Sequence, residues 1–160
     1  MQELAGNLWD YLGKGIIAIT TNGHVTWDGR AVLGQGAARQ AGERFPALAR
    51  ELGEAIRTGG NHVHELGGGL VSFPVEDSPW SLPDLRLIRR SARELHDLAE
   101  KRGWPLVVVP RPGCGGGGLD WKDVAPILAE CFDARFHLIT SVSDATPNRP
   151  SSASFTGGWP

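Results

Sequence analysis

The most informative stretch of the chain is Arg111-Pro112-Gly113-Cys114-Gly115-Gly116-Gly117-Gly118-Leu119-Asp120-Trp121. A β-branched run, Val107 to Val109, precedes it, and an amphipathic segment with Val124, Ile127 and Leu128 follows it. This order predicts a strand, a glycine loop and a helix. Because glycine lacks a Cβ, several backbone N–H groups of such a loop can point into one small volume, beside the unpaired N–H groups of the following helix. The stretch therefore predicts an anion-binding corner, typically for a phosphate, although its composition also fits a flexible surface loop.

Outward from this loop, the chain alternates between apolar strands and amphipathic helices. Strands are expected over residues 15–21, 61–66, 70–75, 106–109 and 135–140, with helices after Gly36, after Pro46, from Ser81 as N-cap to Arg102, and from Asp120 as N-cap. Such alternation predicts a three-layer α/β fold with a largely parallel central sheet. Ligands of such sheets bind beyond the carboxyl ends of the strands, so the loops at 33–36, 74–80 and 111–121 are expected to converge on one cleft.

Length and composition set further bounds. The 160 residues, with 41% hydrophobic and 21% charged side chains, predict one globular domain over residues 1–140, followed by a poorly ordered tail over 141–160. No apolar run reaches the ~20 residues of a membrane span, and a net charge of −2 argues against a protein held to nucleic acid by bulk electrostatics. Cys114 and Cys131 form neither a disulfide framework nor a metal-ligand spacing. We therefore expect a cytoplasmic monomer without metal, cofactor or membrane partner.

The glycine loop fits neither common nucleotide motif. Gly113, Gly115 and Gly118 satisfy G-x-G-x-x-G, but the dinucleotide fingerprint belongs to the first strand-loop-helix unit, and this loop lies in the last one. The Walker pattern fails because no Lys-Ser or Lys-Thr follows Gly118.

Four blocks of the sequence point to another family. They are Leu33-Gly34-Gln35-Gly36-Ala37-Ala38, Arg44-Phe45-Pro46, Phe73-Pro74-Val75 with Trp80 after it, and Pro112-Gly113-Cys114-Gly115-Gly116-Gly117-Gly118-Leu119-Asp120-Trp121. With these blocks the chain resembles a macrodomain from about Gly6 to Thr140. More narrowly, it resembles the branch that holds the terminal ADP-ribose protein glycohydrolase and the antitoxin macrodomains that remove ADP-ribose from DNA. The resemblance implies a three-layer α/β/α fold with a mixed, largely parallel sheet, and ADP-ribose lying across its strand ends.

The resemblance also implies positions for the ligand. Asn7 and Leu8 would lie near the adenine. The exocyclic amine of the adenine would donate a hydrogen bond to the side-chain carbonyl of Asn7, where many macrodomains have an Asp. Asn22 would lie near the distal ribose, residues 34–37 would flank that ribose, and residues 113–119 would cradle the pyrophosphate. The full set of implied ADP-ribose-binding residues is Asn7, Leu8, Asn22, Gly34, Gln35, Gly36, Ala37, Pro74, Val75, Pro112, Gly113, Cys114, Gly115, Gly116, Gly117, Gly118 and Leu119.

The chain departs from this branch where the catalytic lysine is expected. Glu76 follows the Phe-Pro-Val stretch in place of that lysine, and Lys14, Lys101 and Lys122 fall in no matching position. A carboxylate reverses the local charge, so we expect a module that binds free ADP-ribose or a mono-ADP-ribosyl mark. The alternative is an ADP-ribosyl glycohydrolase or an ADP-ribose 1″-phosphate phosphatase, with Glu76 as general base. The segment 23–32 is also longer than in close relatives, and Gly117 stands where some members carry Asp.

Other residues leave two interpretations open. Cys114 is either a nucleophile activated by the helix start or a plain loop residue. His62 and His64 are either two zinc ligands or part of a strand surface, and Trp27 either stacks on a base or packs against its own hairpin. One face of the helix that ends at Arg102 is basic and consists of Arg86, Arg89, Arg90 and Arg93. This face either contacts a nucleic acid weakly or is simply solvated.

Overall fold

The computed structural model describes residues 1–141. Its elements are β1 (Gln2–Ala5), β2 (Ile16–Asn22), α1 (Gly36–Arg44), α2 (Leu48–Gly59), β3 (Glu65–Leu66), β4 (Leu70–Glu76), α3 (Leu85–Arg102), β5 (Val107–Pro110), α4 (Trp121–Ala129) and β6 (Phe136–Thr140), with short 3-10 helices η1 (Leu8–Tyr11) and η2 (Gly67–Gly69). The predicted poorly ordered tail lies outside the described residues, apart from Ser141. Among residues 1–141 no helix is long and apolar enough to cross a membrane, and the cytoplasmic location stays a prediction.

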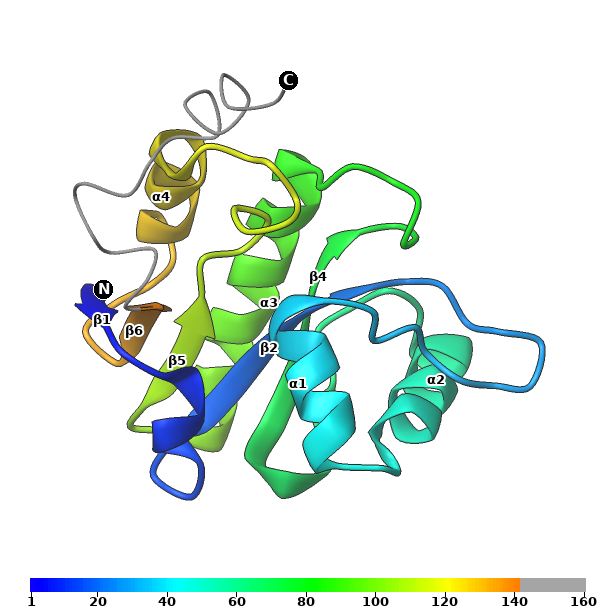
Figure 1. Ribbon diagram of the computed structural model, residues 1–160. Helices are drawn as coiled ribbons and strands as arrows, with labels where there is room; N and C mark the ends of the chain where they lie inside the picture. Colours follow the sequence, from blue (N-terminus) through cyan, green and yellow to red (C-terminus); the bar gives the residue numbers. More distant parts are fainter. Residues whose placement is uncertain (142–160) are drawn as a thin grey trace, which may run out of the picture.

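One six-stranded sheet forms the centre of the described chain, in the order β1-β6-β5-β2-β4-β3. The neighbouring strands pair in parallel, except β3 with β4, which pair antiparallel. In Figure 1 the helices α1 and α2 lie on one side of this sheet and α3 and α4 on the other. The predicted three-layer α/β/α fold with a mixed, largely parallel sheet is therefore confirmed.

Alternate residues of the central strands face different helix layers. Ile17 and Ile19 of β2 pack in a core with residues of α1 and α2, whereas Ala18 packs in the core of α3 and α4. In β5, Val108 joins the first core, and its two neighbours join the second. Because both faces of the sheet are covered, these strands carry nearly continuous apolar runs, which is why the sequence revealed them.

The segment 23–32 leaves β2 as a short hairpin and docks on α2. An antiparallel bridge joins Val25 to Ala31. The hairpin approaches α2 at Gly53, where a Cβ would lie only 2.1 Å from the carbonyl oxygen of Gly29. The missing side chain at Gly53 therefore lets the backbone of the hairpin rest directly on the helix.

The start of α3 differs from the prediction. Ser81 was expected to cap this helix, but the N-cap is Asp84, whose side chain accepts from the N–H of Arg86 at 2.8 Å. Ser81 instead exchanges a hydroxyl hydrogen bond of 2.8 Å with Ser78. The Asp84 carboxylate satisfies one N–H group of the first turn and carries the charge that the helix dipole favours there, which leaves the serine free to close the preceding loop.

Two further strand predictions change in the structure. The expected strand over residues 61–66 shortens to Glu65–Leu66, because the N–H of His64 donates to the side chain of Ser72 at 2.8 Å and leaves no regular backbone ladder there. The first strand, Gln2–Ala5, was not predicted, since mostly exposed residues of an edge strand lack an apolar run.

Candidate functional site

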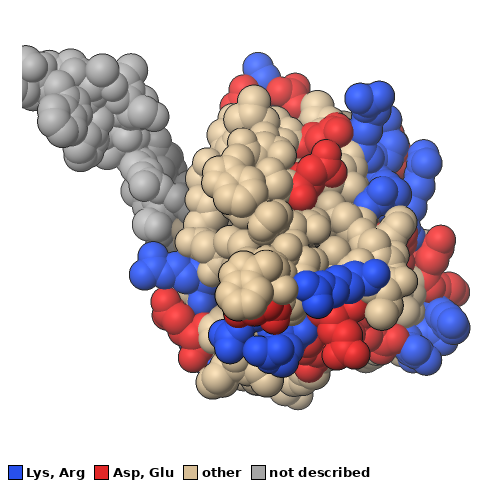
Figure 2. Space-filling view, turned by 90° about the vertical axis from the view of Figure 1, so that its right-hand side faces the viewer, with Lys and Arg blue, Asp and Glu red and all other residues tan. Residues whose placement is uncertain are grey.

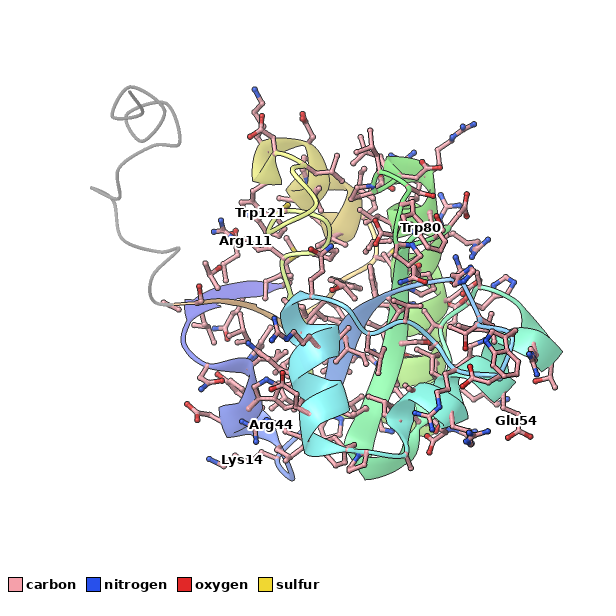
Figure 3. All side chains as sticks on the ribbon, turned by 45° about the vertical axis from the view of Figure 1, so that its right-hand side comes forward. Lys14, Arg44, Glu54, Trp80, Arg111 and Trp121 are labelled. Atoms are coloured by element: carbon pink, nitrogen blue, oxygen red, sulfur yellow. The ribbon has the colours of Figure 1, made fainter. Side chains whose placement is uncertain are left out.

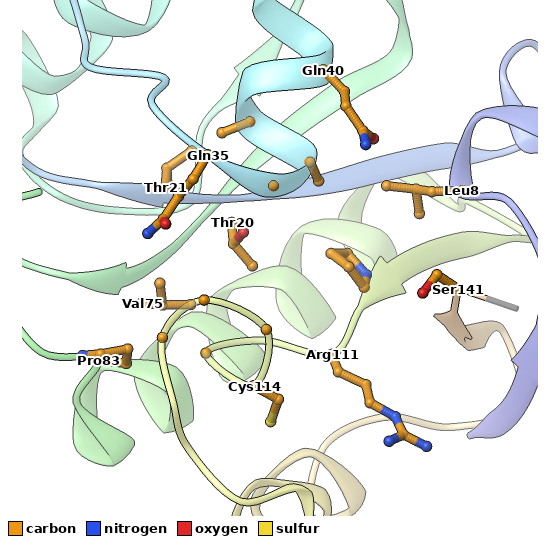
Figure 4. A pocket seen from close by; sticks show the side chains of 18 of the residues that line it. Leu8, Thr20, Thr21, Gln35, Gln40, Val75, Pro83, Arg111, Cys114 and Ser141 are labelled. Atoms are coloured by element: carbon orange, nitrogen blue, oxygen red, sulfur yellow. The ribbon is translucent and has the colours of Figure 1, made fainter. Parts of the chain in front are cut away.

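A cleft of about 940 Å³ opens at the carboxyl ends of the parallel strands. The loops that leave β2, β4 and β5 line it, together with the segments that follow β1 and β6. Figure 4 shows the loop after β5 below the start of α1, with Val75 between them on the side of β4. The predicted convergence of three strand-to-helix loops on one cleft is confirmed, and its volume suits a nucleotide-sized ligand.

The glycine loop after β5 presents backbone donors to this cleft. Gly113 and Gly118 turn the loop with φ values of 73° and 80°, and the N–H of Leu119 closes it by donating to the Gly113 carbonyl at 2.9 Å. Within the described chain, the N–H groups of residues 115–117 donate to no protein acceptor. Because residues 115–117 line the cleft and their N–H groups are free to bond a ligand, the loop is suited to an anion.

The first turn of α1 lines the same cleft. Its N-cap residue, Gln35, makes no side-chain capping hydrogen bond, so the first N–H groups of the helix stay unpaired. Instead the Gln35 side chain reaches the glycine loop, where a Cβ on Gly116 would lie 2.9 Å from its Oε1, as the direction of Gln35 in Figure 4 shows. Two backbone segments whose N–H groups have no protein acceptor among residues 1–141, one in the first turn of α1 and one in the glycine loop, therefore line the same cleft, and the dipole of α1 favours an anion there.

Asn7, Leu8 and Gln40 also line the cleft, and Figure 4 shows Leu8 on the side of Gln40 and away from Val75. The side-chain oxygen of Asn7 accepts from the N–H of Trp9 at 3.0 Å and so caps η1. The indole N–H of Trp9 donates to the Gln40 side-chain oxygen at 2.7 Å. The oxygen expected to accept from an adenine amine is therefore already engaged once inside the protein.

Asn22 holds the entry and the exit of the hairpin at residues 23–32. Its side chain is 8% exposed, its Nδ2 donates to the Val32 carbonyl at 3.1 Å, and its Oδ1 accepts from the N–H of His24 at 3.0 Å. The amide thus fixes the shape of the loop that leads into the start of α1, in addition to lining the cleft.

Glu76 brings a carboxylate into the cleft at the end of β4. The register between β2 and β4 shifts at Thr21 and Asn22, and this irregularity sets the position of Glu76. Within residues 1–141 the Glu76 carboxylate has no hydrogen bond and no ion pair. Burial without a partner raises its pKa above the ordinary value. The Glu76 carboxylate is therefore free to accept a proton from a molecule bound in the cleft.

Cys114 behaves as a loop residue. Burial raises the pKa of its thiol to about 11, and its Sγ lies 3.4 Å from the carbonyl oxygen of Pro112, to which it donates. In Figure 4 the side chain points away from α1. A thiol that remains protonated near neutral pH is a poor nucleophile, so the structure argues against the nucleophile interpretation.

Arg111 is a cation of the cleft lining that the prediction did not include. Its guanidinium lies 4.8 Å from the centre of the Trp121 ring and 3.8 Å from the carboxylate of Glu3. The same carboxylate accepts from the Trp121 indole at 2.7 Å, and Figure 3 shows Arg111 and Trp121 side by side. These contacts tie β1, the glycine loop and α4 together and direct the guanidinium away from the loop donors.

No protein-family model matches the chain, and no curated protein matches its sequence. Solved structures do match its fold. The macrodomain of Mycobacterium tuberculosis DarG has 22% identity and a TM-score of 0.72, over 88% of this chain and 98% of that chain. The macrodomain of Thermus aquaticus DarG has 20% identity and a TM-score of 0.71, over 88% and 96%. Thermosipho africanus DarTG in complex with ADP-ribose has 18% identity and a TM-score of 0.73, over 92% of this chain and 44% of that one.

The chain has the macrodomain fold. The resemblance predicted from the four sequence blocks is therefore confirmed at the level of the fold. Since the identities are low, these similarities establish the fold and assign no activity to the residues of the cleft.

Within the macrodomain fold, most of the predicted binding residues lie together around the cleft. The predicted residues that line it are Asn7, Leu8, Asn22, Gly34, Gln35, Gly36, Ala37, Val75, Glu76, Gly113, Cys114, Gly115, Gly116 and Gly117. Pro74, Pro112, Gly118 and Leu119 are not part of the lining. They support it from behind: the Pro74 carbonyl accepts from Ser91 of α3 at 2.7 Å, and Leu119 packs beneath Gly113.

Sequence reasoning missed several residues of the cleft. They include Thr20 and Thr21 at the end of β2, Gln40 on α1, Pro83 before α3, and Arg111. The two threonines directly precede Asn22 at a strand end, which is a usable signal. No sequence signal marked Gln40, because only the packing of η1 against α1 brings this residue to the cleft.

The remaining candidates sit outside the cleft. His62 Nδ1 lies 2.7 Å from Glu94 Oε2, and His64 Nε2 lies 2.8 Å from the Gly60 carbonyl oxygen. Residues 1–141 contain no cluster of three or more His, Cys, Asp or Glu side chains that could hold a metal ion. Trp27 is 94% exposed, so the interpretation that it packs against its own hairpin is wrong.

The predicted basic face on α3 is partly neutralised. Arg89 pairs with Glu130 at 3.3 Å, and Arg90 pairs with Glu94 at 3.5 Å. Figure 2 shows basic and acidic side chains interspersed over the visible face of the molecule. Weak nucleic-acid contact through Arg86, Arg89, Arg90 and Arg93 stays a prediction, as does the monomeric state.

Proposed function

We propose that the chain binds ADP-ribose in this cleft, either as the free compound or as a mono-ADP-ribosyl mark on a macromolecule. The observation that carries the proposal is the convergence of unpaired N–H groups from residues 115–117 and from the first turn of α1 on one cleft. The ADP-ribose complex of Thermosipho africanus DarTG, which shares the fold, supports the same choice of ligand.

The ligand would lie along the cleft in one direction. Its diphosphate would accept from the N–H groups of the glycine loop and of α1, because these are the strongest anion-binding groups present. The adenosine would extend toward Asn7 and Leu8, and the distal ribose toward Asn22 and Glu76. This placement directs the reactive anomeric carbon of the distal ribose toward the end of the cleft that contains the free carboxylate.

Calorimetric titration tests the proposal directly. We expect ADP-ribose to bind, ADP to bind more weakly and adenosine to give no measurable heat, since only the first two carry the diphosphate. The absence of heat with ADP-ribose at millimolar concentration would overturn the proposal. Equal affinity for ADP-ribose and adenosine would show that the glycine loop is not the diphosphate site.

A second candidate function is hydrolysis of the ADP-ribosyl bond, and Glu76 is the observation that favours it. A carboxylate with a raised pKa and no partner can act as a general base. In that reaction Glu76 would take a proton from water, the water oxygen would bond to the anomeric carbon, and the bond to the modified group would break. The leaving group would then take up a proton.

Release of ADP-ribose from modified protein or DNA separates the two functions. If the wild type is a hydrolase of this kind, Glu76→Gln should lose activity, because an amide keeps the size of the side chain but cannot accept the proton. If the wild type only binds, neither it nor Glu76→Gln releases ADP-ribose, and Glu76→Lys is the variant in which activity could be gained. An active wild type with an equally active Glu76→Gln variant would exclude Glu76 as the base.

A further inference from the structure

A second, smaller pocket of about 410 Å³ adjoins the cleft at its Asn7 end. The two pockets share Asn7 and Gln40, and the smaller one continues along α1 past Trp9 to Glu43 and Arg44. Figure 4 shows Gln40 on the Leu8 side of the cleft, and Figure 3 shows Arg44 farther along α1. A ligand in the cleft therefore has room to extend beyond its Asn7 end.

Apart from the Glu43 carboxylate, the free polar groups of this pocket are hydrogen-bond donors, and the contacts of Trp9 are the reason. Both N–H groups of Trp9 are donors only, so each must face an oxygen. The main-chain N–H donates to Asn7 Oδ1 at 3.0 Å, and the indole N–H donates to Gln40 Oε1 at 2.7 Å. The side-chain nitrogens Asn7 Nδ2 and Gln40 Nε2 therefore remain available as donors, and within residues 1–141 neither donates to a protein acceptor.

Arg44 adds a positive charge to these donors. Its guanidinium stacks over the Trp9 ring with its central carbon 4.8 Å from the ring centre. Stacking occupies the face of the guanidinium and leaves its edge N–H groups available. Among the described residues no carboxylate forms an ion pair with Arg44. Trp9, 8% exposed, thus acts as a fixed platform that organises two amides and one cation.

The one acidic residue of this lining, Glu43, is engaged elsewhere. Its carboxylate lies 3.2 Å from Arg39, one helical turn earlier on α1. This pair is exposed and weak, but it lowers the negative charge that an incoming anion meets. The chemistry that fits two amide N–H donors and a free guanidinium is a phosphate group, whose oxygens only accept when it is fully ionised.

We propose that this pocket is a subsite for a phosphate monoester carried by the adenosine ribose of the ligand. The inference rests on the proposed function, because it requires ADP-ribose in the cleft with its adenosine end at Asn7. The 5′ position of that ribose already carries the diphosphate, so the extra phosphate reaches the pocket from the 2′ or the 3′ position. The chain would then distinguish phosphorylated from plain ADP-ribose.

The experiment compares the dissociation constants of ADP-ribose, ADP-ribose 2′-phosphate and ADP-ribose 3′-phosphate by calorimetry at low ionic strength, where the charge of Arg44 is least screened. For the wild type we expect one phosphorylated ligand to bind about tenfold tighter than ADP-ribose, the gain expected of a charge-assisted hydrogen bond of about 1.4 kcal/mol. Arg44→Gln should reduce this ratio to about one and leave the affinity for ADP-ribose unchanged, since Arg44 does not line the main cleft.

Two variants serve as controls for charge. Lys101→Gln removes an exposed positive charge from the last turn of α3, which lies on the opposite face of the sheet from α1 and its Arg44, and should keep the wild-type ratio. Glu43→Gln removes the carboxylate of the pocket and should raise the ratio. Opposite shifts for Arg44→Gln and Glu43→Gln would support a local electrostatic origin of the preference.

Failure of the subsite and failure of the proposed function give different results. If ADP-ribose binds but neither phosphorylated ligand binds more tightly, the subsite is overturned and the proposed function stands. If the preference exists but survives Arg44→Gln, the pocket is not its origin and the inference is likewise overturned. If none of the three ligands binds, the proposed function is wrong and the subsite falls with it.

Discussion

Replacing Gly117 by alanine should destabilise the protein and weaken ligand binding, whereas the same change at Gly115 should not destabilise it. Both glycines have φ values outside the left-handed region, so alanine brings no backbone strain to either. The two positions differ in space. A Cβ at Gly117 would lie 2.6 Å from the carbonyl oxygen of Gly113 and 2.7 Å from Pro83, whereas a Cβ at Gly115 would meet nothing within 4 Å.

The magnitude follows from these contacts. The distance of 2.6 Å from the new Cβ to the Gly113 oxygen is about 0.8 Å shorter than an ordinary van der Waals contact, and overpacking of this kind costs about 1–3 kcal/mol of folding stability. The displaced Gly113 carbonyl also accepts from Leu119 at 2.9 Å, a hydrogen bond with a net contribution of about 1 kcal/mol. Alanine regains about 0.4–1 kcal/mol by restricting the unfolded chain. The net loss should be about 1–3 kcal/mol for Gly117→Ala, against a gain of up to about 1 kcal/mol for Gly115→Ala.

Urea denaturation of both variants, followed by calorimetry with ADP-ribose, measures these effects. At the same slope, the midpoint of Gly117→Ala should fall below that of the wild type and the midpoint of Gly115→Ala should not. Gly117→Ala should also bind ADP-ribose about tenfold more weakly, because a shifted loop misdirects its donors. Equal midpoints for the two variants would refute the contact argument. A destabilised Gly117→Ala that binds with wild-type affinity would refute the link between loop shape and ligand.

Three other predictions follow from the same structure. Gly53→Ala should lower the free energy of unfolding measured in urea, because the new Cβ would lie 2.1 Å from a backbone oxygen of the hairpin, and this overlap outweighs the higher helix propensity of alanine. The control Gly42→Ala in α1 should not lower that free energy, because its Cβ would meet only the movable Leu33 side chain at 3.2 Å. Cys114, with its pKa raised to about 11, should react slowly with iodoacetamide at pH 7.5 or so and faster as the pH approaches that value, and rapid labelling of the folded protein at neutral pH would contradict its burial. The folded state holds the Glu76 proton more tightly than the unfolded chain, so its contribution to stability falls as pH rises from the ordinary carboxyl pKa through the raised one. Urea midpoints of the wild type and Glu76→Gln across that range should therefore diverge in favour of the variant at higher pH, and parallel curves would refute the shift.

Local patterns predicted most of the architecture. The valines before the glycine loop and the repeat of apolar residues along α3 are signals within a few residues, and each led to an element that the structure contains. The errors arose where a side-chain hydrogen bond competes with a local rule. Asp84 caps α3 in place of Ser81, and the N–H of His64 donates to the side chain of Ser72 in place of a strand partner.

The site divides in the same way. Glycine content and position predicted that the loop at residues 113–118 borders the cleft, since backbone freedom is a property of the residue itself. The contacts of Arg111 with Trp121 and Glu3 were not predictable, because β1 and α4 are more than a hundred residues apart in the chain. The direction of the Asn7 amide was missed for a related reason, since Trp9 and the fold around it decide which atom faces the cleft.

The sequence by itself therefore determined the order of strands and helices, the converging loops and the glycine-rich donor loop, because apolar periodicity and glycine act over short distances along the chain. Only the tertiary structure decided which polar atoms remain unpaired. The free N–H groups of residues 115–117, the isolated carboxylate of Glu76 and the donor-lined pocket at Arg44 are defined by what distant segments do or do not supply. Hydrogen-bond pairing is a property of the folded chain as a whole, and the specificity of the cleft rests on that pairing.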